Sequence, residues 1–95
     1  MFVVNLAYKV DLSLIDAGLT EHAEWLAKQY ADGVFVLSGR QVPRTGGLIL
    51  AVNTTREGLD RRLSSDPFHQ RDYADYTIIE CSPTRVADGL ERLHD

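Results

Sequence analysis

The stretch VFVLSGRQVPRTGGLILAVNT, residues 34–54, contains two apolar runs separated by a short turn. Residues 34–42 and residues 48–54 are rich in Val, Leu and Ile, which is typical of strands because these side chains fit a pleated surface. The segment PRTGG, residues 43–47, is the expected turn, in which Gly46 and Gly47 are able to take positive φ. This stretch therefore predicts a β-hairpin.

The segment before the hairpin predicts a strand and then a helix. Residues 1–10, MFVVNLAYKV, carry β-branched and aromatic residues without Gly or Pro, which indicates a strand. Residues 13–33 predict a helix that stops at Gly33, and Gly18 marks a bend or a later start. Its apolar stripe recurs at three- and four-residue steps and consists of Ile15, Leu19, His22, Leu26 and Tyr30.

The segment after the hairpin predicts a second helix and a last strand. Residues 55–66 form a short helix, with Leu59 and Leu63 four residues apart. Residues 66–73 are expected to form a helical turn or loop, and residues 75–83 to form a strand. The tail, residues 84–95, is either a frayed helix or an arm.

The resulting element order is β-α-β-β-α-β, with one hairpin and two helical crossovers. This order predicts an α+β, ferredoxin-like fold, in which a four-stranded antiparallel sheet carries two helices on one face. The 95 residues contain no linker, repeat or low-complexity run, so we expect a single domain over residues 1–95.

The predicted strands are apolar on both faces. Residues 2–4, 34–37 and 48–52 do not alternate apolar with polar side chains, although the helices can cover only one face of the sheet. One interpretation is a partly exposed apolar face, since apolar residues are common on surfaces. The other is a second copy of the chain packed sheet against sheet, and we expect this homodimer because no segment is left to form a third layer.

Composition argues against several classes of partner. The net charge is −4 and the basic residues are scattered, whereas a nucleic-acid site needs a basic patch. No run approaches the ~20 apolar residues of a membrane span, and the start lacks the features of a signal peptide. The single cysteine, Cys81, has no internal disulfide partner and is expected to pack as a small hydrophobe. Together these features indicate a cytoplasmic protein.

His22 and Asp66 are the strongest candidates for chemistry. His22 shares its helix face with Leu19 and Leu26, so its ring is expected to point at the sheet, where both nitrogens need partners. It is either a satisfied core residue or a base. Asp66 precedes Pro67, a pair typical of an N-cap followed by the first helical residue. Asp66 either caps only, or caps with one oxygen while the other accepts from His22, which would make the free ring nitrogen a better base.

The remaining candidates have simpler alternatives. Ser38 and Gly39 end a strand, where small residues either let a ligand approach the backbone or simply terminate the strand. Arg40 and Arg44 flank the turn and either hold a substrate carboxylate or are ordinary surface residues. Trp25 and Phe68 either line a pocket or pack in the core. The three histidines have no metal-ligand spacing and no nucleotide fingerprint is present, so we expect no metal and no cofactor.

Four segments together resemble the YciI-like family over nearly the whole chain: residues 1–9 (MFVVNLAYK), 22–26 (HAEWL), 33–39 (GVFVLSG) and 66–80 (DPFHQRDYADYTIIE). The resemblance implies a ferredoxin-like domain that dimerises through its sheets, in the dimeric α+β barrel superfamily. It also implies an active site with a His–Asp pair, matched here by His22 and Asp66, and a small-residue step matched by Ser38 and Gly39.

Two departures from the family pattern concern the pocket rim. Arg40 stands where the family often has Pro, and Arg71-Asp72 stands where it often has Ala-Gly. Where an activity is proposed for this family it is lyase-like, and the superfamily includes muconolactone isomerases and cofactor-free oxygenases. We therefore expect His–Asp acid–base chemistry of a lyase or isomerase, dehydrohalogenase-like, on a small cyclic or aromatic-derived carbon acid, with Ser38, Gly39, Arg40 and Phe68 contacting the ligand. The alternative is a non-catalytic dimer that binds a small ligand.

Overall fold

The hairpin expected around residues 34–54 is present in the computed structural model, which describes residues 1–94. Strand β2 (Phe35–Arg40) pairs antiparallel with β3 (Gly46–Ala51). Strand β1 (Phe2–Tyr8) lies between β3 and β4 (Ala74–Glu80) and is antiparallel to both. The sheet order is therefore β2-β3-β1-β4.

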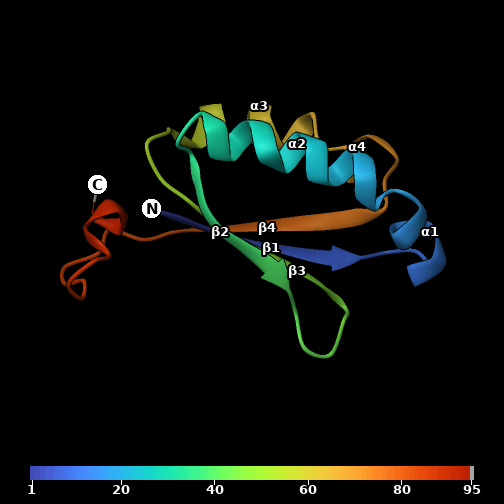
Figure 1. Cartoon of the computed structure of the whole chain (residues 1–95), viewed down its shortest axis with the longest axis horizontal. Helices are drawn as coiled ribbons and strands as arrows, with labels where there is room; N and C mark the ends of the chain where they lie inside the picture. Colours follow the sequence, from blue (N-terminus) through green and yellow to red (C-terminus); the bar gives the residue numbers. More distant parts are fainter. Residues whose placement is uncertain (95) are drawn as a thin grey trace.

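The helices lie in the two crossovers of the chain. Helices α1 (Leu12–Ala17) and α2 (Leu19–Ala31) follow β1, whereas α3 (Arg56–Ser64) and α4 (Pro67–Gln70) lie between β3 and β4. Figure 1 shows α2, α3 and α4 above one face of the sheet, while the opposite face carries no helix. The predicted α+β, ferredoxin-like arrangement is confirmed. The helix expected over residues 13–33 is divided at Gly18, where a β-carbon would lie 3.0 Å from the Phe68 ring.

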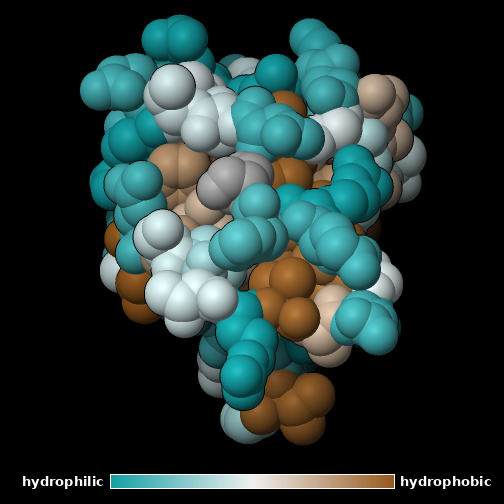
Figure 2. Space-filling view, turned by 90° about the vertical axis from the view of Figure 1, so that its left-hand side faces the viewer, coloured by the Kyte–Doolittle hydropathy of each residue, from teal (hydrophilic) through white to brown (hydrophobic). Residues whose placement is uncertain are grey.

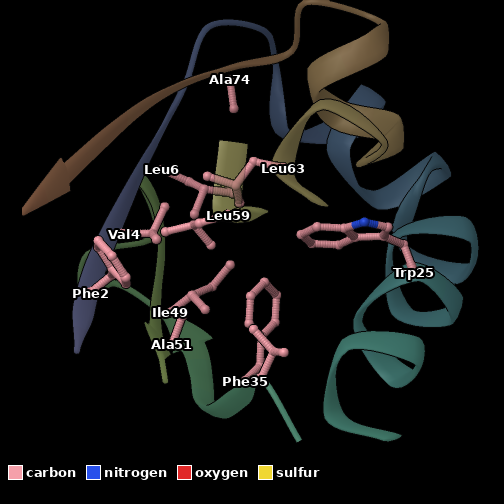
Figure 3. Close-up of a cluster of buried hydrophobic side chains, with 11 residues drawn as sticks. Phe2, Val4, Leu6, Trp25, Phe35, Ile49, Ala51, Leu59, Leu63 and Ala74 are labelled. Carbon is pink, nitrogen blue, oxygen red and sulfur yellow. The ribbon is translucent and has the colours of Figure 1, made fainter. Parts of the chain in front are cut away.

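The core lies between these helices and the inner face of the sheet. Figure 3 shows side chains of β1 and β3 facing Trp25 of α2 and the Leu59–Leu63 pair of α3. The sheet contributes alternate residues, as the period of two in a strand requires. These residues are Phe2, Val4 and Leu6 from β1 and Ile49 and Ala51 from β3, joined by Phe35 of β2 and Ala74 of β4.

The face of α2 that enters the core is not the expected one. Trp25 and Gln29 are the buried residues, at 8% and 2% exposure. Leu19 and Tyr30 are 39% and 41% exposed, so the expected burial of the stripe at these two positions is wrong. Trp25 and Gln29 each lie one position N-terminal to Leu26 and Tyr30 of the predicted stripe, so the buried face is rotated by about 100° around the helix. His22 lies where the buried line of residues and the predicted stripe meet.

Polar ends of the buried residues explain this rotation. The Trp25 indole Nε1 donates to the Arg62 carbonyl and to Ser65 Oγ, both at 3.0 Å. The Arg62 guanidinium donates to Gln29 Oε1 and to Asp32 Oδ2, both at 2.7 Å. Because α3 supplies these partners, α2 can bury an indole and an amide that would otherwise remain unsatisfied.

Gly46 and Gly47 lie inside strand β3 instead of in the turn. Neither has positive φ, and among residues 1–94 the glycines with positive φ are Gly33 and Gly89. Gly46 is needed for another reason, since a β-carbon there would lie 1.7 Å from the Leu6 carbonyl oxygen of β1. The close approach of two paired backbones, and not turn geometry, explains this glycine.

The face of the sheet opposite the helices is apolar and exposed. Val3 of β1 lies opposite Leu50 and Ile79, and Leu50 lies opposite Leu37, so one apolar row crosses all four strands. Leu37 is 46% exposed and Ile79 is 60% exposed. Figure 2 shows the side of the molecule on which the termini lie, with its larger hydrophobic areas in the lower half, away from the helices.

Residues 81–94 form no long helix. Strand β4 ends at Glu80, three residues earlier than expected, and a 3-10 turn follows at Glu91–Leu93. Cys81 is exposed, so the expectation that it packs as a small hydrophobe is wrong. The backbone explains its position, because Cys81 N–H bonds to the Met1 carbonyl at the edge of the sheet.

Gly46→Ala is expected to destabilise the fold severely, by about 4 kcal/mol or more, because the new methyl group would overlap the Leu6 carbonyl and separate β1 from β3. Gly39→Ala in the same hairpin is the matched control, since a β-carbon at Gly39 meets nothing within 4 Å. Urea unfolding followed by circular dichroism would measure both. Equal midpoints for the two variants would contradict this interpretation.

Candidate functional site

His22 lies in the first turn of α2 and is held between a carboxylate and an aromatic ring. Its imidazole stacks on Phe68, with ring centroids 4.3 Å apart and planes inclined by 11°. Its Nδ1 atom lies 2.8 Å from Oδ1 of Asp66. The His22 side chain is 14% exposed, so the ring is packed on one side and still reachable.

Asp66 is fully buried and accepts three hydrogen bonds. Oδ1 accepts from His22 and from the Phe68 backbone N–H at 3.1 Å, and the second of these bonds caps α4. Oδ2 accepts from the Tyr76 hydroxyl at 2.5 Å. The two roles considered for Asp66 therefore coexist, but one oxygen serves both of them and the other oxygen binds Tyr76.

This arrangement selects the tautomer of His22. Both oxygens of Asp66 act as acceptors, as expected of an ionised carboxylate. Nδ1 of His22 is therefore the donor, and it carries the proton of its hydrogen bond to Oδ1 of Asp66. The other ring nitrogen, Nε2, then keeps its lone pair and has no hydrogen-bond partner within residues 1–94. A lone pair on a nitrogen backed by a carboxylate is the arrangement that a general base requires.

Tyr76 is a third member of the cluster that the sequence analysis missed. It lies on β4, and its hydroxyl is the donor to Oδ2 of Asp66. Burial, followed by the neighbouring Asp66 charge, raises the pKa of Tyr76 well above its ordinary value, so the hydroxyl stays a donor. Strand alternation in the sequence could have indicated that Tyr76 faces inward, because Tyr76 and Ile78 are two residues apart and both pack against the core.

A cavity of about 380 Å³ opens beside His22, between α2 and the β2–β3 hairpin. All four residues expected to contact a ligand line it together with His22, namely Ser38, Gly39, Arg40 and Phe68. The remaining lining residues are mostly apolar: Leu6, Tyr8, Leu19, Ala23, Leu26, Gly47, Leu48 and Ile49. A cavity of this size, with apolar walls and a few polar groups, is typical of sites for small organic molecules.

The exposed apolar stripe of α2 forms one wall of this cavity. Leu19, His22 and Leu26 all line it, whereas Trp25 on the neighbouring line of the helix enters the core. Of the side chains that the periodicity grouped with His22, Leu19 and Leu26 thus line a cavity, whereas Ile15 is fully buried and Tyr30 lies outside the cavity. This explains why α2 carries apolar side chains that are only partly buried.

Arg44 and Arg71 lie outside the cavity and are paired, whereas Ser38 lines the cavity. Arg44 forms an ion pair with Asp16, and Arg71 forms one with Glu21. Ser38 lines the cavity, but its hydroxyl shares a 2.7 Å hydrogen bond with Tyr30 and has no adjacent base. Within residues 1–94, no group of three His, Cys, Asp or Glu side chains is placed to hold a metal ion.

Comparison with known proteins identifies a family. The family model described as YCII-related domain matches residues 1–82, which include the sheet, the helices and every residue of the cavity. No curated protein matches the chain. Within the described residues, no helix is both long and apolar enough to cross a bilayer.

Tyr76→Phe should destabilise the fold by about 1–3 kcal/mol, because it leaves Oδ2 of the buried Asp66 without its donor. Tyr73→Phe is the matched control, since the Tyr73 hydroxyl has no hydrogen-bond partner within residues 1–94. The comparison requires urea unfolding of both variants at neutral pH. Similar losses in the two variants would contradict the role given to Tyr76.

The raised pKa of Tyr76 also predicts a dependence on alkaline pH. The folded-state pKa lies above the unfolded value of about 10, so this stabilising contribution is complete below pH 10 and is lost as pH rises further. Between pH 9 and pH 11 the wild type should therefore lose more unfolding free energy than Tyr76→Phe. Parallel losses in the two proteins would show that Tyr76 is not the group responsible.

Proposed function

The chain belongs to the YCII-related family, and from this premise we propose that it is an enzyme in which His22 and Asp66 catalyse proton transfer on a small cyclic or aromatic-derived carbon acid. The observation that carries the proposal is the 2.8 Å contact between Nδ1 of His22 and the buried Asp66, combined with the position of the same ring on the cavity wall. The reaction class is an elimination or an isomerisation.

The proposed step begins at Nε2 of His22. This atom takes a proton from a substrate carbon, and the electron pair left behind either expels a leaving group or shifts along the substrate. In an isomerisation the imidazolium then returns the proton to another carbon. Asp66 offsets the positive charge of the imidazolium and keeps the ring in place, as an orienting carboxylate does for other histidine bases.

A non-catalytic ligand-binding module is the second candidate, and the apolar cavity favours it equally well. A third possibility, in which His22 only stabilises the core, fits less well because the imidazole of such a residue would be expected to be fully buried. The ring is 14% exposed and lines the cavity. Turnover measurements separate the first two candidates.

We also propose that the chain forms a homodimer through its uncovered sheet face, packed as in a dimeric α+β barrel. The apolar row across the four strands supports a second copy of the chain as the partner of this face. The row ends in large exposed apolar side chains, Leu37 on one edge strand and Ile79 on the other. The next row, formed by Thr77, Asn5, Leu48 and Gly39, carries no formal charge. These two rows of two copies therefore meet without like-charge repulsion.

His22→Gln should abolish turnover while preserving the fold. Asp66→Asn should lower turnover by roughly 10²–10⁴-fold, because an amide still bonds the ring but does not offset its charge. The assay is a panel of halogenated hydroquinones, enol-lactones and related carbon acids. Halide release, and exchange of the carbon-bound proton with deuterated solvent, would be followed by NMR.

Arg61→Gln on the exposed surface of α3 is the control for turnover, since Arg61 does not line the cavity beside His22. If a ligand binds wild type and His22→Gln alike, and none of the proteins turns over any substrate or exchanges its proton, the catalytic proposal fails. The binding module then remains as the function of the cavity.

Leu37→Glu should convert the proposed dimer into monomers, because it places a charge in the apolar row. Leu14→Glu on α1 is the matched control, since Leu14 and Leu37 are 45% and 46% exposed and the substitution is the same. Sedimentation equilibrium at micromolar concentration distinguishes a 10.6 kDa monomer from a dimer. A monomeric wild type, or equal effects of the two substitutions, would refute the proposed interface.

A further inference from the structure

Among the residues that the structure describes, Arg40 is a cation without a partner at the edge of the cavity. It is the last residue of β2, it is exposed, and it lines the cavity. Within residues 1–94 its side chain forms no hydrogen bond and no ion pair. The charge of Arg40 acts on the carboxylate of Asp16, whose pKa is lowered first by its bond to Arg44 and to a smaller extent by Arg40. Because Arg44 occupies Asp16, the guanidinium of Arg40 remains available.

Among the described residues that line the cavity, Arg40 is the one with a fixed charge. None of the lining residues within the described chain is a carboxylate. Asp66 lies behind the His22 ring, where its oxygens are occupied by three hydrogen bonds. An anion entering the cavity therefore meets one lining cation and no lining carboxylate, and the nearby Asp16 is paired with Arg44. This local feature contrasts with the net charge of −4 of the whole chain, which would otherwise repel anions.

The cavity walls describe the rest of the ligand. Apolar side chains from α2 and the sheet lie on both sides of the space, and Phe68 and His22 present stacked rings at one end. Such walls favour a compact ring over a polar chain. The planar guanidinium of Arg40 suits a carboxylate, which it binds with two parallel hydrogen bonds.

We propose that the cavity binds a small cyclic or aromatic carboxylate, with the carboxylate on Arg40 and the ring extending between α2 and the sheet toward His22. This inference rests on the proposed function in one respect, since it names the substrate class of the same cavity. It depends on Arg40, whereas turnover depends on His22 and Asp66, so binding and catalysis can be tested separately.

The probes are benzoate and its neutral isostere benzamide, titrated against the protein and followed by amide chemical shifts in NMR. Benzoate should bind with a dissociation constant on the order of 1 mM, as expected for so few atoms, with shifts confined to the cavity. Benzamide should bind roughly tenfold more weakly, because it lacks the charge that Arg40 recognises. Arg40→Gln should remove this preference, whereas Arg61→Gln, with the same change in net charge, should retain it.

His22→Gln distinguishes Arg40 from a protonated imidazole as the anion-binding group. The preference for benzoate should survive in His22→Gln and disappear in Arg40→Gln. The inference is overturned if the preference disappears in His22→Gln but survives in Arg40→Gln, or if benzoate and benzamide bind wild type equally. An absence of saturable benzoate binding overturns it as well, and leaves the turnover test of His22 unaffected.

Discussion

The buried carboxylate of Asp66 is the interaction on which the site and its surroundings depend. It joins the Phe68 amide at the start of α4, the imidazole of His22 on α2 and the hydroxyl of Tyr76 on β4. A carboxylate without exposure costs several kcal/mol of desolvation unless donors compensate it. The Phe68 donor is local to α4, whereas the His22 and Tyr76 donors lie on α2 and β4, so these two elements must pack against the start of α4 before their bonds to Asp66 form.

The position of the cavity follows from which residues of α2 enter the core and which residues line the cavity. One line of the helix, with Trp25 and Gln29, is bound to α3 through an indole and an amide and enters the core. The adjacent line, with Leu19 and Leu26, faces the cavity. His22 lies where the lines meet, so its ring reaches the buried Asp66 through one nitrogen while its other edge borders open space. The same rotation that keeps Leu19 out of the core thus places the imidazole where a ligand can reach it.

Most of the fold was predictable from local patterns. The hairpin at residues 34–54 and the Leu59–Leu63 pair follow from periodicity and composition, which act over a few residues. The errors came where distant segments compete for space. Gly46 looked like a turn residue, but the Leu6 carbonyl of another strand explains it. Cys81 was expected to pack inside, but the edge of the sheet holds it at the surface. No pattern near either residue carries this information.

The sequence by itself determined the order of elements, the family, and the suspicion that His22 and Asp66 belong together, because these depend on residue types and spacing along the chain. Only the tertiary structure decided that one oxygen of Asp66 both caps α4 and holds His22, and that Tyr76 occupies the other. It also decided that, within residues 1–94, Arg40 forms no ion pair at the cavity edge, since Arg44 binds Asp16. Hydrogen bonds and ion pairs between residues 10 to 44 positions apart depend on three-dimensional proximity, which spacing along the chain does not encode.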